Sequence, residues 1–271
     1  MKPHVFVYPD KGTVAQAGAQ RTLLAIAEDL NERDAHGRRI RERVNVILTG
    51  GSDSILSLKL MANNPLVDSI DWKRVHFWWG DERFVPADSD DRNSLQARRA
   101  LLDDLVAKGD LPESNIHEMA PDTRSADAIA SASDSENDAV LDSAARAYEE
   151  ELVQELGESP IFDLAVMGMG PDGHYASLFP GHHEITITDR LAVGVNHSPK
   201  MPPLRVSLTA PLLAQARRTW FLTAGEGKVN ALAHVLEKPN NVDYPSSFAN
   251  GTEEYHWIVT EDALPEPDDK A

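Results

Sequence analysis

The chain has 271 residues, a formal net charge of −18, a hydrophobic share of 41% and no cysteine. This length allows one large α/β domain or two small ones, and the acidic balance disfavours nucleic acid and anionic membranes, because both require a basic surface. The absence of cysteine excludes disulfides, thiolate zinc ligands and cysteine nucleophiles, and it fits a cytoplasmic enzyme.

Short apolar runs alternate with segments of helical spacing. We predict strands at residues 5–8, 44–48, 75–79, 162–167, 191–195, 219–224 and 256–260. Helical spacing connects Leu23 to Leu30 and Val229 to Leu236, and further helices are predicted to begin after Thr209, with Pro211 in the first turn, and at Asn93. The alternation predicts a three-layer, Rossmann-like α/β fold whose largely parallel sheet is covered by helices on both faces.

Residues 1–271 are interpreted as a single domain without internal repeats. Residues 122–143, DTRSADAIASASDSENDAVLDS, have almost no large apolar side chain, so we predict a solvated, mobile surface loop, partly helical and without chemistry. The tail after residue 263 is predicted to be frayed. The N-terminus has no long apolar region with a cleavage site, and no apolar run approaches the ~20 residues that span a bilayer.

Ligands of a parallel α/β sheet lie outside the carboxyl ends of its strands, so the loops after the predicted strands are the candidate site. Thr49, Gly50, Gly51 and Ser52 follow the second predicted strand and precede a helical pattern. Paired glycines let the backbone approach a ligand, and a helix N-terminus offers free N–H groups to an anion. A tight strand-to-helix turn without a ligand explains the same residues.

Charged residues follow two further predicted strands. After 75–79, Asp81 and Glu82 directly precede Arg83, and an arginine held by carboxylates suits a phosphate, although a surface ion-pair cluster is equally compatible. After 191–195, Lys200 and Arg205 lie in a proline-rich stretch that holds them with little loss of chain entropy. In so acidic a chain they would supply local positive charge for an anionic ligand, unless they are only scattered surface charges.

The fourth loop, GMGPDGHYASLFPG at residues 168–181, matches the dinucleotide fingerprint G-x-G-x-x-G, with Asp189 about 20 residues further on. A carboxylate at Asp172 would repel the pyrophosphate that such a loop binds, which argues against a nicotinamide-dependent dehydrogenase. Asp172 and His174 on a glycine-shaped turn suit proton transfer better. A structural histidine is the alternative.

No metal or organic cofactor is predicted. His182 and His183 are adjacent, but no H-E-x-x-H or comparable spacing of ligands accompanies them. The chain also lacks a G-x-S-x-G elbow, which argues against a serine hydrolase triad.

Together these loops resemble the 6-phosphogluconolactonases, which share a superfamily with the glucosamine-6-phosphate deaminases. The matching stretches are LTGGS (48–52), WWGDERFVPADSDDRNS (78–94), FDLAVMGMGPDGHYASLFPG (162–181), SPKMPPLRVSLT (198–209) and GEGKVNAL (225–232). The resemblance runs from near the N-terminus to Trp257, apart from the segment 122–143, which looks like an insertion.

Three differences of sequence bear on this resemblance. Deaminases follow a similar D-G-H loop with A-F-N-E-P, whose glutamate completes a catalytic triad, whereas this chain has ASLFPG and no acid, which favours the lactonase. The family's usual Ser-Thr-Pro after the paired glycines is Ser52-Asp53-Ser54 here, which puts the phosphate contacts of that loop in doubt. Tyr175 replaces a usual threonine beside the histidine.

The resemblance implies hydrolysis of 6-phospho-D-glucono-1,5-lactone to 6-phospho-D-gluconate in the oxidative pentose phosphate pathway, with His174 as the general base on water. Asp172 would orient His174 or contact a sugar hydroxyl. Substrate phosphate and ring would be held by Gly50, Gly51, Ser52, Asp81, Arg83, Lys200 and Arg205.

The resemblance implies no cofactor and no partner beyond the small sugar-phosphate lactone. A monomer or small homo-oligomer is expected. A deaminase-like enzyme and a non-catalytic sugar-phosphate-binding protein are the alternatives.

Overall fold

Seven strands form the central sheet of the structure, a computed structural model that describes residues 1–265. In spatial order the strands are β1 (His4–Tyr8), β10 (Glu254–Thr260), β9 (Arg218–Thr223), β6 (Leu164–Gly168), β2 (Val44–Leu48), β3 (Val75–Trp79) and β5 (Ile116–His117). Each adjacent pair is parallel. The carboxyl ends of all these strands therefore lie along one edge of the sheet.

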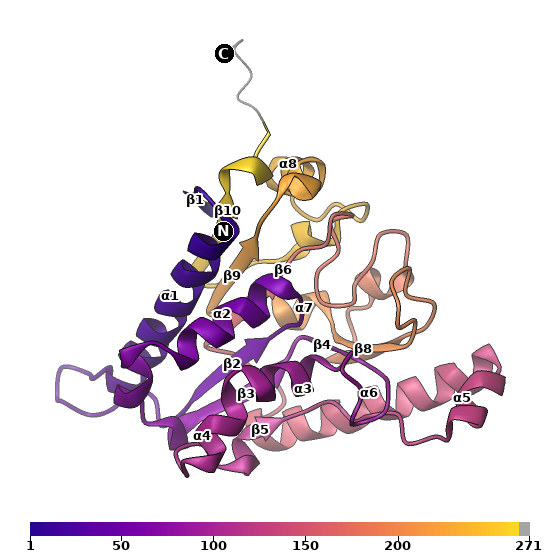
Figure 1. The fold of residues 1–271 in the computed structure, drawn as a ribbon, viewed down its shortest axis with the longest axis horizontal. Helices are drawn as coiled ribbons and strands as arrows, with labels where there is room; N and C mark the ends of the chain where they lie inside the picture. The colour runs from indigo at the N-terminus through magenta and orange to yellow at the C-terminus, as the bar shows by residue number, and fades with distance from the viewer. Residues whose placement is uncertain (266–271) are drawn as a thin grey trace.

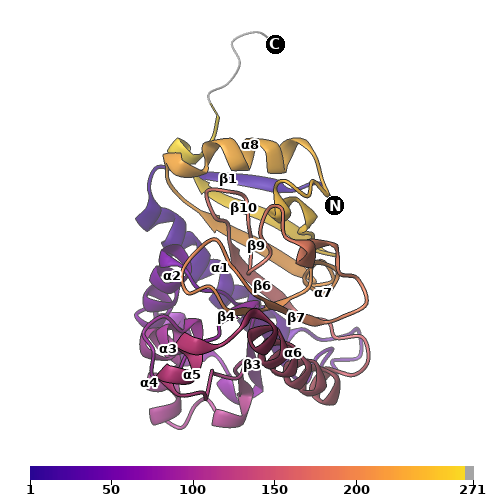
Figure 2. The same ribbon diagram turned by 90° about the vertical axis from the view of Figure 1, so that its right-hand side faces the viewer.

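Helices cover both faces of this sheet (Figures 1 and 2). On one face lie α1 (Lys11–Asn31), α2 (Ser52–Ala62), α3 (Asn93–Ala97) and α4 (Asp103–Ala107), with a π-helical turn, Arg98–Leu102, joining the last two. On the other face lie α6 (Asp134–Leu156), α7 (Ala210–Leu213) and α8 (Val229–Glu237). The predicted three-layer α/β fold is confirmed, and the helices predicted from Leu23, Asn93, Thr209 and Val229 are present.

Strand β3 shows why the sheet needs both helical layers. Trp78 packs in the core cluster that includes α6, whereas Phe77 and Trp79 pack in the cluster that includes α1 and α2. All three side chains are fully buried. Successive side chains of a strand point to opposite faces, so a strand that is apolar at every position is stable only between two layers.

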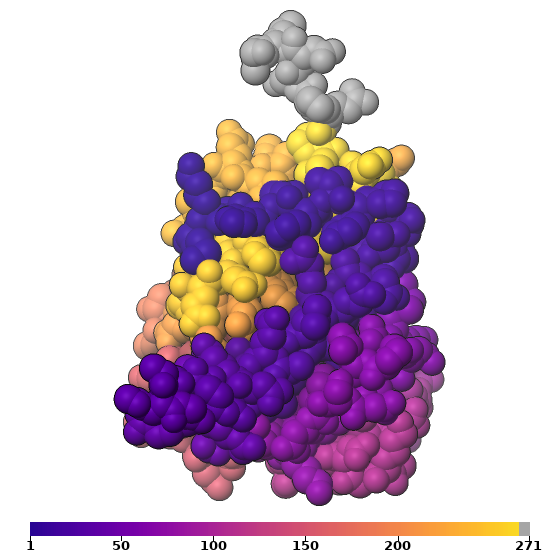
Figure 3. All heavy atoms as spheres, turned by 90° about the vertical axis from the view of Figure 1, so that its left-hand side faces the viewer, coloured from indigo at the N-terminus to yellow at the C-terminus, as the bar shows by residue number. Residues whose placement is uncertain are grey.

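The first strand forms one edge of the sheet. β1 pairs with β10 from His4 opposite His256 to Tyr8 opposite Thr260, and the N-terminal residues lie directly against the C-terminal strand (Figure 3). This pairing brings the start of α1, at Lys11, to the carboxyl edge of the sheet. Within residues 1–265, no helix has the length and apolar character that a membrane span requires.

A second, antiparallel sheet contains β4 (Asp81–Arg83), β8 (Arg205–Leu208) and β7 (Ala192–Val195). The strand predicted at 191–195 is therefore present, and it belongs to this antiparallel sheet and not to the parallel one. Residues 196–204 lead directly into β8 without a helix, and a parallel pairing requires a crossover of about a dozen residues or more. β4 continues β3 after Gly80, so the small sheet extends from the carboxyl edge of the large one.

Most of the segment 122–143 is helical. It contains α5 (Ala126–Ser131) and the beginning of α6, where Ser133 and Glu136 form a capping box. The prediction of a solvated loop is wrong where α6 begins, because Leu141 is 1% exposed and packs against β7. That the segment is an insertion stays a prediction. Of the tail predicted to be frayed after residue 263, residues 266–271 lie outside the described residues.

Candidate active site

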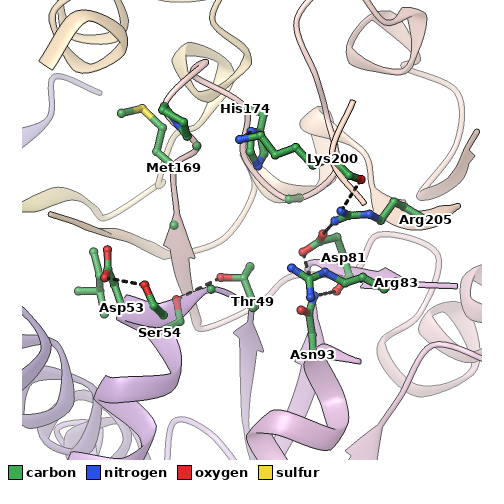
Figure 4. Close-up of a pocket in the computed structure, with 18 of the residues that line it drawn as sticks. Thr49, Asp53, Ser54, Asp81, Arg83, Asn93, Met169, His174, Lys200 and Arg205 are labelled. Atoms are coloured by element: carbon green, nitrogen blue, oxygen red, sulfur yellow. Dashed lines mark hydrogen bonds and ion pairs between the residues drawn. The ribbon is translucent and has the colours of Figure 1, made fainter. Parts of the chain in front are cut away.

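A cavity of about 240 Å³ lies at the carboxyl edge of the sheet (Figure 4). Its walls come from the loops after β2, β3 and β6, from the loop before β8, and from the turn after β9. The predicted site residues that line it are Gly50, Gly51, Ser52, Asp81, Arg83, His174, Lys200 and Arg205. The ninth, Asp172, contacts His174. The structure thus brings all nine together.

His174 and Asp172 form a close pair in the loop after β6. Asp172 Oδ1 is 2.5 Å from His174 Nδ1, and Lys200 Nζ is 3.4 Å from each of these two atoms. A hydrogen bond to an ionised carboxylate places the proton of a neutral imidazole on Nδ1, which leaves Nε2 with the free lone pair. His174 is 17% exposed at its side chain, so the ring is largely held by protein while it still reaches the cavity.

The electrostatics of the pair favour an ionised Asp172 and a neutral His174. Burial lowers the pKa of His174, and the hydrogen bond and charge of Asp172 oppose this without cancelling it. Burial by itself would raise the pKa of Asp172, but the hydrogen bond from His174 and the charges of His174 and Lys200 hold it well below its usual range. A neutral imidazole next to a carboxylate is a base that can take a proton from water.

The glycines of the loop that carries the pair use their N–H groups for hydrogen bonds within the loop. The Gly170 N–H donates to the His174 carbonyl at 2.8 Å, and the Gly173 N–H donates to the Gly170 carbonyl at 3.0 Å. A dinucleotide fingerprint needs free glycine N–H groups followed by a helix N-terminus, and no α-helix begins between residues 169 and 209. The match to G-x-G-x-x-G therefore lacks the structural context of a dinucleotide site.

The loop after β2 offers backbone donors to the cavity. Gly51 has φ +98° and directly precedes α2, so the N–H groups of the first turn, beginning at Ser52, have no partner within the helix. Gly50 allows a close approach by Asn93, because a Cβ at this glycine would lie 1.9 Å from Asn93 Oδ1. Free N–H groups in this arrangement are the donors with which helix N-termini bind anions.

The two acids after β3 have different surroundings, and neither belongs to a surface ion-pair cluster. Glu82 is 1% exposed, and its carboxylate accepts the N–H groups of Asn93 at 2.7 Å and Ser94 at 2.9 Å, which caps α3. Burial raises the pKa of Glu82, although Arg92 and these hydrogen bonds oppose the shift. Asp81 lines the cavity instead, where it accepts the hydroxyl of Ser177 at 2.6 Å.

Arg205 holds the loop before β8 in place. The side chain is nearly fully buried, and its guanidinium donates to the carbonyls of Pro202 at 2.8 Å and Lys200 at 3.0 Å. Its Nη1 is 3.9 Å from Asp81 Oδ2. Burial lowers the pKa of Arg205, and Asp81 opposes the shift. The stiffness predicted from the prolines of this loop thus has a second source, the arginine itself.

Comparison with known proteins places the chain in a family. The pattern of the family described as glucosamine-6-phosphate isomerases/6-phosphogluconolactonase matches residues 9–257. The chain belongs to this family.

Two relatives match over nearly their full length. A 6-phosphogluconolactonase of Streptomyces coelicolor is 37% identical over 95% of this chain and 92% of its own. A 6-phosphogluconolactonase of Mycobacterium tuberculosis is 35% identical over 97% of this chain and 98% of its own.

Solved structures agree with these sequence matches. The 6-phosphogluconolactonase of Thermotoga maritima is 26% identical and superposes with a TM-score of 0.74, covering 96% of this chain and 100% of the other. The fold described above is therefore the fold of the family.

Lys228, a cation that lines the cavity, is missing from the predicted site residues. Lys228 follows β9 in the family-like stretch 225–232, and its Nζ donates to the carbonyl of Met169. Burial lowers the pKa of Lys228. The signal was available in the sequence, because β9 was predicted and Lys228 lies in the loop after it.

The two departures from the family pattern lie in different surroundings. Asp53 lines the cavity and forms an ion pair with Lys11, 2.7 Å away. Tyr175 is fully buried in the core cluster under α6, with its ring 6.1 Å from that of Phe221. The change at Tyr175 therefore affects packing behind the loop, whereas Asp53 adds a charge to the site itself.

Potential metal ligands gather away from the cavity. Within residues 1–265, His76, His117 and Glu155 bring one ligand atom each to within 4.8 Å of one another. These groups already have partners, because His76 Nδ1 is 2.9 Å from His117 Nε2 and Arg43 donates to Glu155 at 2.9 Å. Burial, with the charge of Arg43, lowers the pKa of His76 to about 4.

Proposed function

We propose that this enzyme hydrolyses 6-phospho-D-glucono-1,5-lactone to 6-phospho-D-gluconate with His174 as the general base on water. The lactonase activity rests on full-length relatives of 35% and 37% identity that are 6-phosphogluconolactonases. The assignment of the base rests on one observation, the 2.5 Å contact between His174 Nδ1 and Asp172 Oδ1 at the wall of a cavity that cations also line.

The reaction proceeds by addition and elimination at the lactone carbonyl. Water attacks C1 while His174 Nε2 takes one of its protons, and the carbonyl electron pair moves to oxygen. The bond from C1 to the ring oxygen then breaks, the carbonyl re-forms, and the ring oxygen takes the proton from the imidazolium. General-base assistance of this kind contributes about 10²- to 10⁴-fold in rate.

Asp172 is proposed to orient His174. Its carboxylate fixes the proton on Nδ1, so that Nε2 faces the water, and it stabilises the imidazolium that forms during the reaction. Lys200, 3.4 Å from both members of the pair, keeps Asp172 ionised, and its positive charge would stabilise the oxyanion that develops on the carbonyl oxygen.

The phosphate is proposed to bind at the N-terminus of α2. Gly50, Gly51 and Ser52 provide backbone and hydroxyl donors there, and Lys228 adds a cation. Figure 4 shows Asp53 and Ser54 on the opposite side of the view from Arg83 and Arg205, which accords with one end of the substrate at α2 and the other at the two arginines. We assign Asp81, Arg83 and Arg205 to the sugar ring.

A coupled assay of 6-phosphogluconate formation tests the reaction, with spontaneous hydrolysis subtracted. We expect a kcat/KM far above that for unphosphorylated gluconolactone, because only the phosphorylated substrate contacts α2 and Lys228. Replacement of Lys228 by Ala should raise KM for the phosphorylated lactone. Equal efficiency with both lactones would contradict the phosphate site, and binding without turnover would indicate a sugar-phosphate-binding protein instead.

The deaminase alternative has less support. The stretch after His174, residues 175–181, contains no acidic residue that could complete a deaminase triad. The cytoplasmic location and the monomeric or small homo-oligomeric state stay predictions.

A further inference from the structure

Lys11 and Asp53 form an ion pair beside the cavity that the reaction as proposed does not use. Lys11 Nζ is 2.7 Å from Asp53 Oδ1 and 2.7 Å from Ser52 Oγ. Ser52 and Asp53 both line the cavity, and Lys11 contacts both of them from beside it. Lys11 comes from α1 and the two other residues from α2, so the pair joins the N-termini of two helices that pack together.

Considered alone, Lys11 is unfavourable for its own helix, and Asp53 is unfavourable for a phosphate bound beside it. Asp53 lies in the first turn of α2, among the N–H groups assigned to the phosphate, where a carboxylate repels a second anion. Lys11 is the first residue of α1, and the dipole of a helix disfavours a cation at its N-terminus. Interaction with the dipole of α2 would explain why an acid stands at Asp53, but not why a cation stands at Lys11. The ion pair between them explains the position of both charges.

The N-cap of α1 fixes the backbone position of Lys11. Asp10 caps α1 by accepting the N–H of Thr13 at 2.8 Å, which sets Lys11 as the first helical residue. Lys228 approaches the same region from the turn after β9. Burial lowers the pKa of Lys228, the charge of Lys11 lowers it further and that of Asp53 raises it, so the three groups lie within electrostatic range of one another.

We propose that Lys11 is a phosphate-binding residue of this enzyme and that Asp53 positions it beside Ser52 at the N-terminus of α2. This inference rests on the proposed function. The ammonium group has three N–H donors, of which Asp53 and Ser52 take two. No other acceptor among residues 1–265 takes the third, which is available to a phosphate oxygen. Lys11 also compensates the charge of Asp53, so the phosphate meets a net positive site.

Steady-state kinetics of Lys11→Ala with phosphorylated and unphosphorylated lactone test the proposal. The ratio of the two kcat/KM values should fall roughly three- to tenfold through a higher KM for the phosphorylated substrate, as expected for loss of one charge-assisted hydrogen bond at a partly exposed site. Lys11→Arg should restore part of the ratio. Lys59→Ala, an exposed lysine at the other end of α2, is the matched control and should not change it.

The direction in which Asp53→Asn changes KM shows whether Asp53 positions Lys11 or only repels the phosphate. With Lys11 present, we expect a higher KM for the phosphorylated lactone, because the ammonium group loses its anchor. In the Lys11→Ala background the same substitution should lower KM, since an unpaired carboxylate then only repels the phosphate. A lower KM for Asp53→Asn in the presence of Lys11 would overturn the positioning role.

Different results would overturn the role of Lys11 and the proposed function. An active wild type with an unchanged ratio in Lys11→Ala would overturn the role of Lys11 alone. A wild type without turnover would overturn the proposed function, and calorimetry of 6-phosphogluconate binding to wild type and Lys11→Ala would then still measure the contribution of Lys11. Equal dissociation constants in that experiment would overturn it as well.

Discussion

The glycine-rich loops after β2 and β6 follow neighbouring strands of the sheet, yet we propose that they serve different ends of the substrate. After β2, Gly50 makes room for Asn93 and the loop opens the N-terminus of α2 to the cavity. After β6, Gly170 makes room for His174, since a Cβ there would lie 2.0 Å from the imidazole ring. Both Gly50 and Gly170 thus permit the close approach of a side chain, Asn93 in one loop and His174 in the other.

The largest expected effect is at the reacting loop. His174→Ala should lower kcat by about 10²- to 10⁴-fold, because it removes the base, while KM for the phosphorylated lactone changes far less. Stopped assays corrected for spontaneous hydrolysis measure this. His183→Ala, at an 80% exposed side chain, is the control. A folded His174→Ala enzyme with near-wild-type turnover would contradict the assignment of the reaction to the loop after β6.

A single added methyl group should affect catalysis at the same loop. Gly170→Ala forces the His174 ring to move, and a displacement of about 1 Å at a reacting group can lower kcat by roughly 10²-fold. Gly227→Ala is the control, because its Cβ would meet nothing within 4 Å. Circular dichroism verifies folding. An unchanged kcat for Gly170→Ala would show that the ring position is not critical.

The corresponding substitution in the other loop should act on binding. Gly50→Ala displaces the Asn93 side chain, whose Nδ2 donates to the Asp81 carbonyl at 2.9 Å. We expect a rise in KM for the phosphorylated lactone of about tenfold, the loss of one or two hydrogen bonds, with a smaller change in kcat. If instead kcat falls as much as in Gly170→Ala, the two loops do not divide binding from chemistry.

The pH profile gives the smallest but most specific effect. Because the pKa of His174 is lowered, the base stays neutral to below its ordinary pKa of about 6.5, and the acidic limb of kcat/KM should lie below that pH. Asp172→Asn removes a group that raises the His174 pKa, so the limb should move further toward acid while kcat falls. A limb that moves toward neutral pH would contradict the assigned pair.

Much of this site was predictable because its chemistry is local in sequence. Asp172 and His174 are two residues apart on one turn, and the strands at 44–48 and 75–79 begin and end where their apolar runs do. The small antiparallel sheet was not predictable in the same way. β4 has three residues and β8 four, and their pairing depends on segments more than a hundred residues apart.

The sequence by itself determined the layered α/β fold, the family resemblance and the histidine–aspartate loop, since apolar periodicity and short motifs act within a few residues. Only the tertiary structure decided which charges meet. It buried Glu82 as a helix cap, turned Arg205 back onto its own loop, and brought Lys228 and Asp53 to the cavity, with Lys11 paired to Asp53. The physical reason is that a charged side chain meets the side chains of loops whose strands lie next to its own in the sheet. The order in which the strands pair depends on contacts between distant segments, so no single strand sequence predicts it.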